Sequence, residues 1–91
     1  MARIVLIEDE PNIVLAVKMC LERDGHEVLT EVDGIKGLET VVREVPDLVL
    51  LDLLIPQMDG IMVCRVLKDN PATAHVPIVI ISAKSSDADV E

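Results

Sequence analysis

The chain has 91 residues, of which 17 are acidic and 8 basic, with a formal net charge of −9 and 51% apolar residues. This apolar fraction excludes a disordered chain, and the length fits one small globular domain spanning residues 1–91. The acidic charge argues against nucleic-acid binding and favours protein partners and divalent cations. We find neither a signal peptide nor an apolar run long enough for a membrane span, so the sequence predicts a cytoplasmic protein without membrane contact.

The first half of the chain predicts two strands and two helices in alternation. Arg3–Asp9 is a short apolar run that ends in acids, which is typical of a strand buried on both faces. Pro11 suits the first turn of a helix, and Gly25 suits the position after its last turn. His26–Val32 alternates as a second strand, and Asp33 then caps a second helix. The apolar side chains expected to face the core are Ile13, Val17 and Leu21 on the first helix and Leu38, Val41, Val42 and Val45 on the second.

The second half repeats this alternation. Asp47–Asp52 is again an apolar run closed by an acid, and it predicts a third strand. Asp59 and Gly60 open a third helix, Pro77–Ser82 forms a fourth strand, and Ser85–Glu91 begins a further helix. Strands and helices joined in this order by short connections predict an α/β fold, an open parallel sheet with helices on both faces.

Polar side chains follow three of the predicted strands. Glu8, Asp9 and Glu10 follow the first strand, Asp52 the third, and Ser82 the fourth. Because sites in open parallel sheets form at the carboxyl ends of the strands, Asp9 and Asp52 converge if their strands are neighbours. Clustered carboxylates need a proton or a cation, and an oxygen-only site suits Mg²⁺. Beside that cation, Asp52 becomes a candidate nucleophile toward a phosphoryl group.

Simpler structural roles exist for each of these residues taken alone. Acids at Glu8, Asp9 and Glu10 also suit the positive start of a helix. Asp52 can serve as a cap at the end of its strand, and the Ser82 hydroxyl can bond to the backbone. Their arrival at one edge of the sheet favours the functional interpretation.

Three motifs resemble the receiver domain of bacterial two-component response regulators, and the resemblance covers the whole chain. The motifs are IVLIEDE, LVLLDLLIPQMDG and HVPIVIISAK, in that order. The resemblance implies a flavodoxin-like (CheY-like) three-layer α/β/α fold with strand order 2-1-3-4. It also implies a signalling module rather than an enzyme, which accepts a phosphoryl group from a histidine kinase or phosphotransfer protein.

The resemblance further assigns roles to individual residues. Asp52 is implied as the phosphoacceptor, and Asp9, Asp52 and the main-chain carbonyl of Leu54 as the Mg²⁺ ligands. Glu8 is implied to hold a metal-bound water, at a position where the family often has Asp. Ser82 is implied as the switch residue that follows the phosphoryl oxygen.

Two loop residues and one lysine complete the predicted site. By the same resemblance, Pro56 and Gly60 shape the loop that follows Asp52. Lys84 lies two residues beyond Ser82, so both side chains point the same way if the strand continues, and its ammonium could approach phosphorylated Asp52. An ordinary solvated lysine is the simpler interpretation.

The resemblance fails at the C-terminal end. The family continues with a fifth strand that bears a catalytic lysine, and with a fifth helix, and neither precedes Glu91. The sequence thus predicts a receiver domain truncated after the fourth strand, with Ile78–Ile81 as an exposed apolar edge through which the chain self-associates. The alternative function is a receiver fragment that acts as a self-associating assembly piece and is not phosphorylated.

Overall fold

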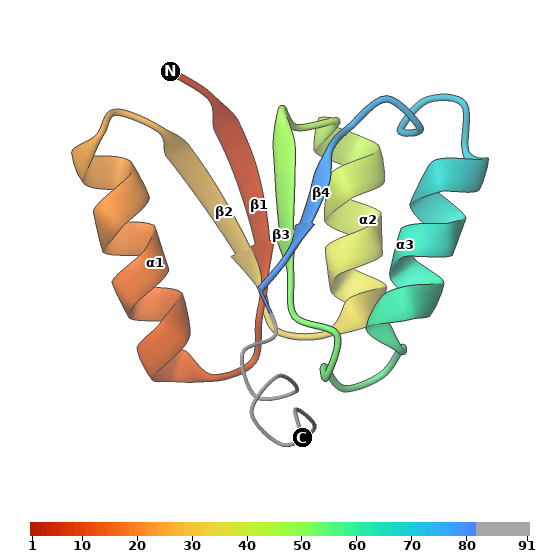
Figure 1. Cartoon of the computed structure of the whole chain (residues 1–91), viewed down its shortest axis with the longest axis horizontal. Helices are drawn as coiled ribbons and strands as arrows, with labels where there is room; N and C mark the ends of the chain where they lie inside the picture. Colours follow the sequence, from red (N-terminus) through yellow and green to blue (C-terminus); the bar gives the residue numbers. More distant parts are fainter. Residues whose placement is uncertain (82–91) are drawn as a thin grey trace, which may run out of the picture.

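The computed structural model describes residues 1–81, which form one parallel sheet and the helices that connect its strands (Figure 1). The elements in chain order are β1 (Arg3–Ile7), α1 (Pro11–Arg23), β2 (Glu27–Glu31), α2 (Gly34–Glu44), β3 (Leu48–Leu51), α3 (Gly60–Asp69) and β4 (Ile78–Ile80). The sheet order is β2-β1-β3-β4, with every pair parallel, which confirms the predicted α/β class and strand order. The helix expected at Ser85–Glu91 lies outside the described residues. No helix within residues 1–81 is long and apolar enough to cross a membrane.

Side-chain caps start two of the helices, as predicted. The Asp33 carboxylate accepts a hydrogen bond from the backbone N–H of Lys36 at 2.7 Å, at the start of α2. The Asp59 carboxylate accepts one from the N–H of Ile61 at 2.9 Å, at the start of α3. Each bond satisfies an amide that has no acceptor within its own helix. These caps fix where α2 and α3 begin beside the loop that follows β3.

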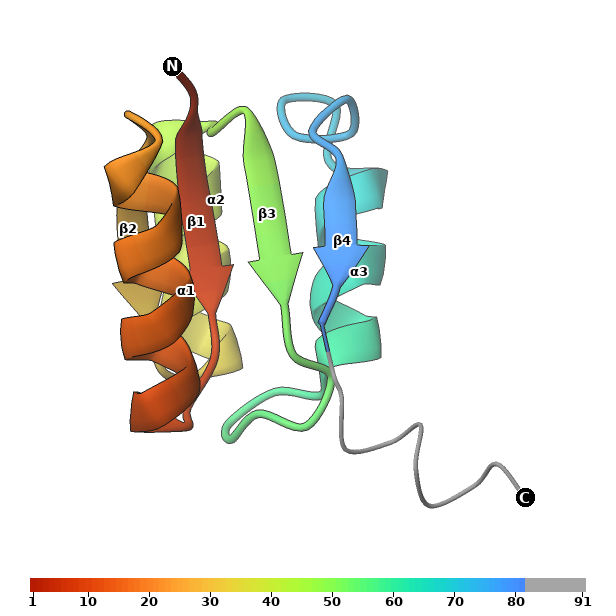
Figure 2. The ribbon, with the colours of Figure 1, turned by 60° about the vertical axis from the view of Figure 1, so that its left-hand side comes forward.

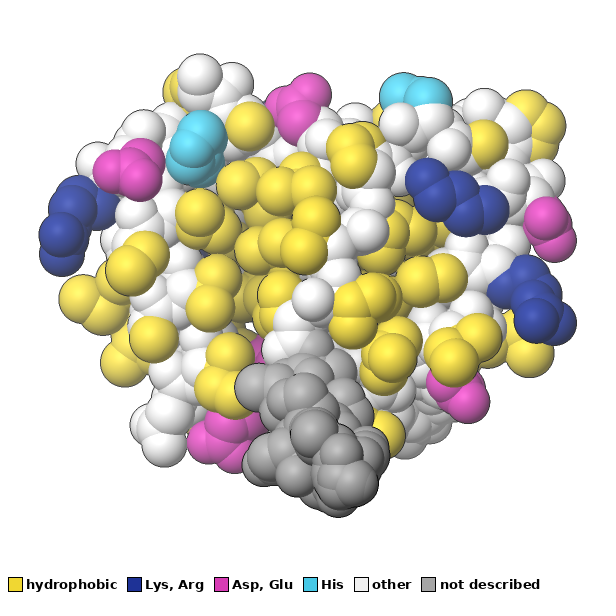
Figure 3. All heavy atoms as spheres, in the orientation of Figure 1, with side chains coloured by type: hydrophobic (Ala, Val, Ile, Leu, Met, Phe, Trp, Pro, Cys, Tyr) yellow, Lys and Arg dark blue, Asp and Glu magenta, His cyan; other side chains and the backbone are white. Residues whose placement is uncertain are grey.

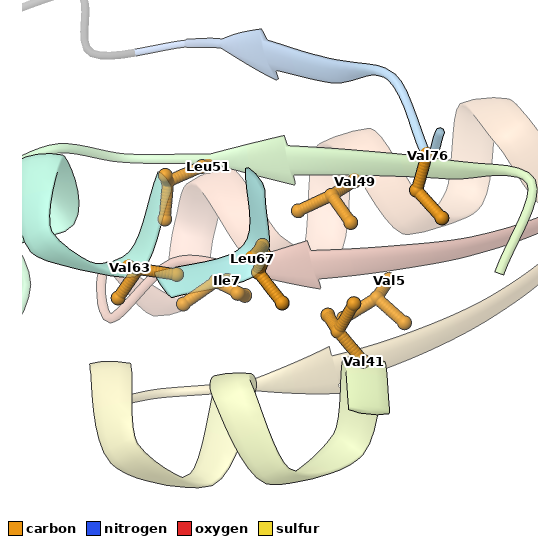
Figure 4. Packing of buried hydrophobic residues seen from close by; sticks show 8 residues of the cluster. All are labelled: Val5, Ile7, Val41, Val49, Leu51, Val63, Leu67 and Val76. Atoms are coloured by element: carbon orange, nitrogen blue, oxygen red, sulfur yellow. The ribbon is translucent and has the colours of Figure 1, made fainter. Parts of the chain in front are cut away.

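A cluster of buried hydrophobic side chains lies between the sheet and the pair of helices α2 and α3 (Figure 4). Eight fully buried aliphatic side chains form it: Val5, Ile7, Val41, Val49, Leu51, Val63, Leu67 and Val76. The prediction for α2 is partly wrong, because Val42 and Val45 are exposed while Gly34, Gly37 and Thr40 are buried. Small residues let α2 approach the sheet closely, and this turns its contact face away from Val42. Val45 lies beyond the last residue of α2, as its C-cap in the left-handed conformation.

Among residues 1–81, α1 is the one helix that covers the opposite face of the sheet, as Figure 2 shows. No residue of α1 is fully buried, so Ile13, Val17 and Leu21 pack only partially. Side chains alternate along a strand, and Val49 and Leu51 belong to the core beneath α2 and α3. Their neighbours Leu48 and Leu50, with Val79 paired to Leu50, therefore lie on the α1 side.

We call Leu48, Leu50 and Val79 the uncovered sheet face. Leu48 and Leu50 are half-buried, and Val79 is 46% exposed. In Figure 3, hydrophobic side chains gather over the middle of the molecule, between α1 and β4. Ile80 of β4, which is 44% exposed, points to the other side of the sheet. The predicted apolar exposure of the fourth strand is thus present at Val79 and Ile80.

Candidate functional site

The carboxyl ends of β1 and β3 bring together the carboxylates of Glu8, Asp9 and Asp52. One oxygen from each of the three lies within 4.8 Å of the others. Glu8 is 1% exposed and Asp52 is 2% exposed, whereas Asp9 is exposed. Because β1 and β3 are neighbours in the sheet, the residue after each strand arrives at the same edge. The predicted convergence of Asp9 and Asp52 is therefore present in the structure.

Backbone amides hold two of these carboxylates in place. Glu8 accepts a hydrogen bond from the N–H of Glu10 at 3.0 Å, and Asp52 Oδ1 accepts one from the N–H of Leu54 at 3.0 Å. The N–H of Asp52 also donates to the carbonyl of Ile7 at 3.0 Å, which extends the pairing of the two strands to the site. The carboxylates of Glu8 and Asp52 are thus held by main-chain amides.

Burial makes this cluster electrostatically costly. Removal from water raises the pKa of Glu8 above its ordinary value, and the nearby charge of Asp52 raises it further. Among residues 1–81, the ion pairs of lysine and arginine engage other acids, as in Arg3–Glu27, Arg3–Glu44, Lys18–Glu22 and Arg43–Glu44. The described part of the chain therefore supplies no basic side chain to the cluster, and a proton or a cation must compensate its charge.

The donor set of the site fits a hard divalent cation. Carboxylate oxygens, such as those of Glu8, Asp9 and Asp52, are the atoms that Mg²⁺ prefers. The exposed position of Asp9 leaves the cluster accessible from solvent, so an ion can enter with part of its water shell. The residues that sequence analysis selected can thus hold such an ion.

The loop that follows Asp52 is anchored at two places. At its base, the N–H of Gly60 donates to the carbonyl of Leu53 at 3.2 Å, and a Cβ on Gly60 would lie 2.5 Å from the Leu53 Cα. Further along, the carbonyl of Pro56 accepts a hydrogen bond from the N–H of Gly34 at 3.0 Å. The geometry is consistent with the loop-shaping roles expected of Gly60 and Pro56. It adds Gly34, which sequence analysis missed.

Two predicted site residues, Ser82 and Lys84, lie outside the described residues. The last described residue, Ile81, donates its N–H to the carbonyl of Leu51 at 3.0 Å. At that point the chain still runs beside β3, one residue before Asp52. The expected roles of Ser82 and Lys84 therefore stay predictions.

Sequence comparison places the chain in a known family. Residues 4–91 match the family described as the response regulator receiver domain. The response regulator PleD of Caulobacter vibrioides is 41% identical over 88 residues, which cover 97% of this chain and 19% of PleD. This protein belongs to the response regulator receiver family, and a receiver domain is a signalling module. The chain spans about a fifth of the length of PleD.

Solved structures support the same assignment of fold. The receiver domain of the sensor histidine kinase PA1611 from Pseudomonas aeruginosa has a TM-score of 0.89 at 27% identity, over 97% of this chain and 72% of that one. That structure is described as having a magnesium ion coordinated in the active site cleft. The phosphorylated cyanobacterial phytochrome response regulator RcpA has a TM-score of 0.82 at 30% identity, over 98% of this chain and 70% of that one.

Proposed function

We propose that this protein, as a single domain over residues 1–91, accepts a phosphoryl group on Asp52 from a histidine kinase or phosphotransfer protein, with Mg²⁺ as cofactor. One observation carries the proposal: the buried Glu8 and Asp52 and the exposed Asp9 lie together without a basic partner among residues 1–81. Two similarities support it, since the PA1611 receiver is described with magnesium in its cleft and RcpA as phosphorylated.

The chemistry assigned to Asp52 is nucleophilic attack on phosphorus. A carboxylate oxygen of Asp52 forms a bond to phosphorus while the bond from phosphorus to the donor's leaving group breaks, and the product is an acyl phosphate. The N–H of Leu54, bonded to Oδ1 at 3.0 Å, keeps the carboxylate in one orientation for this attack.

The ion-binding residues of this proposal are those that the family resemblance implies. Asp9, Asp52 and the main-chain carbonyl of Leu54 would hold Mg²⁺, and Glu8 would bind through a water molecule. When bound, the cation offsets the negative charge of the carboxylates and of the phosphoryl oxygens. Glu8 contributes a buried carboxylate whose pKa is raised by its removal from water, so it keeps its proton to a higher pH than an ordinary glutamate does.

The proposal includes two residues beyond Ile81. Ser82 responds to the phosphoryl group as the switch residue, and Lys84 offers its ammonium to the same group. Replacement of Lys84 by alanine should then slow phosphorylation or shorten the lifetime of the product. Equal phosphorylation rates and equal product lifetimes in the two proteins would mean that Lys84 is an ordinary solvated side chain.

Intact-mass spectrometry tests the proposed function directly. The chain is incubated with a small-molecule phosphodonor, with and without Mg²⁺, beside the Asp52→Asn variant. We expect a gain of one phosphoryl group that requires Mg²⁺ and is absent in the variant. No gain by a chain that circular dichroism shows to be folded would count against the proposal.

A second candidate function is that of a self-associating assembly piece that is not phosphorylated. The observation that favours it is the exposure of apolar side chains on β4, where Val79 is 46% and Ile80 is 44% exposed. Apolar strands at the edge of a sheet are prone to pair with another chain. The two candidate functions can be distinguished by experiment, because self-association requires neither Asp52 nor Mg²⁺.

A further inference from the structure

We propose that Gly34, the first residue of α2, is a positioning residue for the loop of residues 53–59 that follows Asp52. Gly34 belongs to a different element from the loop and is not one of the three clustered acids Glu8, Asp9 and Asp52. It acts through Pro56 and Met58. The inference rests on the proposed function, since the loop matters for the reaction through the main chain of Leu54.

Two contacts join Gly34 to the loop. Its N–H donates to the carbonyl of Pro56 at 3.0 Å. A Cβ built on Gly34 would lie 2.7 Å from both the Cβ and the carbonyl oxygen of Met58, and 3.3 Å from the Cδ1 of Ile55. Carbon atoms do not approach other heavy atoms as closely as 2.7 Å without repulsion, so only glycine fits here. Gly34 thus lets the loop pass directly against the start of α2.

The loop cannot avoid an added methyl group by a side-chain rotation. The carbonyl oxygen of Met58 is part of the main chain, and the Cβ of Met58 is fixed by it. The start of α2 is fixed in turn by the hydrogen bond from the N–H of Lys36 to the Asp33 carboxylate. An alanine at Gly34 must therefore displace the main chain of the loop or the first turn of α2.

This displacement reaches Asp52 through Leu54. Leu54 lies between the two places where the loop is anchored, the Gly60–Leu53 bond at 3.2 Å and the Gly34–Pro56 bond at 3.0 Å. Its N–H orients Asp52, and its carbonyl is the proposed Mg²⁺ ligand. A shift of the loop alters both groups while every carboxylate of the site is retained.

The chain offers a matched control in Gly37, which lies one turn further along α2. A Cβ on Gly37 would lie 2.6 Å from the Cδ1, 2.8 Å from the Cγ1 and 3.0 Å from the Cγ2 of Ile7, all atoms of one core side chain. Gly37→Ala therefore introduces the same methyl group into the same helix and perturbs packing against β1, not the loop. Both variants should lose stability, but only Gly34→Ala should disturb the loop.

The experiment compares backbone amide NMR spectra of the wild type, Gly34→Ala and Gly37→Ala, first without metal and then during titration with Mg²⁺. We expect the amide resonances of residues 53–59 to shift more in Gly34→Ala than in Gly37→Ala before metal is added. We also expect the Mg²⁺ concentration for half-saturation to rise about tenfold in Gly34→Ala, and to stay within about twofold of wild type in Gly37→Ala. Unchanged loop resonances, or an unchanged Mg²⁺ affinity in Gly34→Ala, would overturn the inference.

The proposed function and this inference can fail separately. If the wild type does not bind Mg²⁺, the proposed function fails, and the metal-free spectra alone decide whether Gly34 positions the loop. If Gly34→Ala does not fold, hydrogen exchange in the wild type tests whether the Gly34 amide is bonded to Pro56. The first amides of a helix have no acceptor within it, so protection of the Gly34 amide beyond that of Ile35 supports its bond to Pro56. Equal exchange at Gly34 and Ile35 would refute that bond.

Discussion

The carboxylates of Glu8 and Asp52 lie within 4.8 Å of each other while both are almost fully removed from water. Glu8 follows β1 and Asp52 follows β3, so the pairing of these central strands forces the two groups together. Two like charges in such a position oppose folding unless one is neutralised. The site is thus a source of local instability that a proton or a cation relieves.

Removal of one of the two charges should stabilise the metal-free protein. For Asp52→Asn we expect the free energy of unfolding at neutral pH to rise by about 1 kcal/mol, since an amide retains the acceptor for the N–H of Leu54 but carries no charge. Urea denaturation followed by far-ultraviolet circular dichroism measures this, because the chain has no aromatic residue for fluorescence. A variant less stable than wild type would show that charge repulsion does not dominate.

The raised pKa of Glu8 should make stability depend on pH. The folded chain retains the Glu8 proton at pH values where the unfolded chain has released it, so this contribution to stability is fully present below the ordinary pKa of 4.5. It is lost as the pH rises through the raised pKa of the folded state. Glu8→Gln has no such proton to lose. As the pH rises through this range, the wild type should lose stability and the variant should not, so the variant becomes the more stable of the two by a growing margin.

Denaturation at a series of pH values, with and without Mg²⁺, measures this difference. At the higher pH values, Mg²⁺ should reduce the difference in free energy of unfolding between Glu8→Gln and wild type. The cation then compensates the charge that Glu8 carries once it has lost its proton. A constant difference between the two proteins at all pH values would mean that Glu8 titrates at the same pH folded and unfolded.

The buried hydroxyl of Thr73 should contribute to the stability of the end of α3. It donates to the carbonyl of Leu67 at 2.7 Å, and Thr73 is completely buried. Replacement by valine keeps the shape but leaves that carbonyl without this donor, so Thr73→Val should lower the free energy of unfolding by about 1–2 kcal/mol. Equal denaturation midpoints for wild type and Thr73→Val would show that the bond adds nothing net.

The uncovered sheet face should cause the chain to self-associate. A charge at Val79, which is 46% exposed on β4, should oppose this, so Val79→Lys should shift the chain toward monomer. Val32→Lys is the matched control, since Val32 is exposed between β2 and α2, away from that face. Light scattering over a range of concentrations measures the mass. A wild type that stays monomeric throughout would contradict the prediction.

The fold could be predicted because its signals are local. Apolar runs that end in acids mark the central strands, and side chains such as Asp33 and Asp59 cap helices within a few residues of themselves. The meeting of Glu8, Asp9 and Asp52 follows from the rule that parallel strands end at one edge. Once β1 and β3 are neighbours, no further information is needed to bring these acids together.

The missed features depend on contacts between distant segments. Gly34 carries no apolar or charged signal, and its role appears only when α2 lies against Met58, 24 residues later in the chain. The inward face of α2 was mispredicted for a related reason, because a search for apolar stripes selects Val42 and ignores glycines. A glycine directly after the cap Asp33, at a helix start where a side chain is usually tolerated, is the one local signal of a close approach.

The weak attachment of α1 has a consequence for how ion binding could be detected. No residue of α1 is fully buried, whereas α2 buries Gly34, Gly37, Thr40 and Val41, so α1 should open locally at a lower cost in free energy. The short turn from Glu8 to Glu10 links the acidic cluster to the first residue of α1, Pro11. An ion that fixes this turn should therefore protect α1 from proteolysis more than α2, although α1 supplies none of the three clustered carboxylates. Proteolysis of α1, the one helix of the described fold with no fully buried residue, would then report ion binding at the acidic cluster.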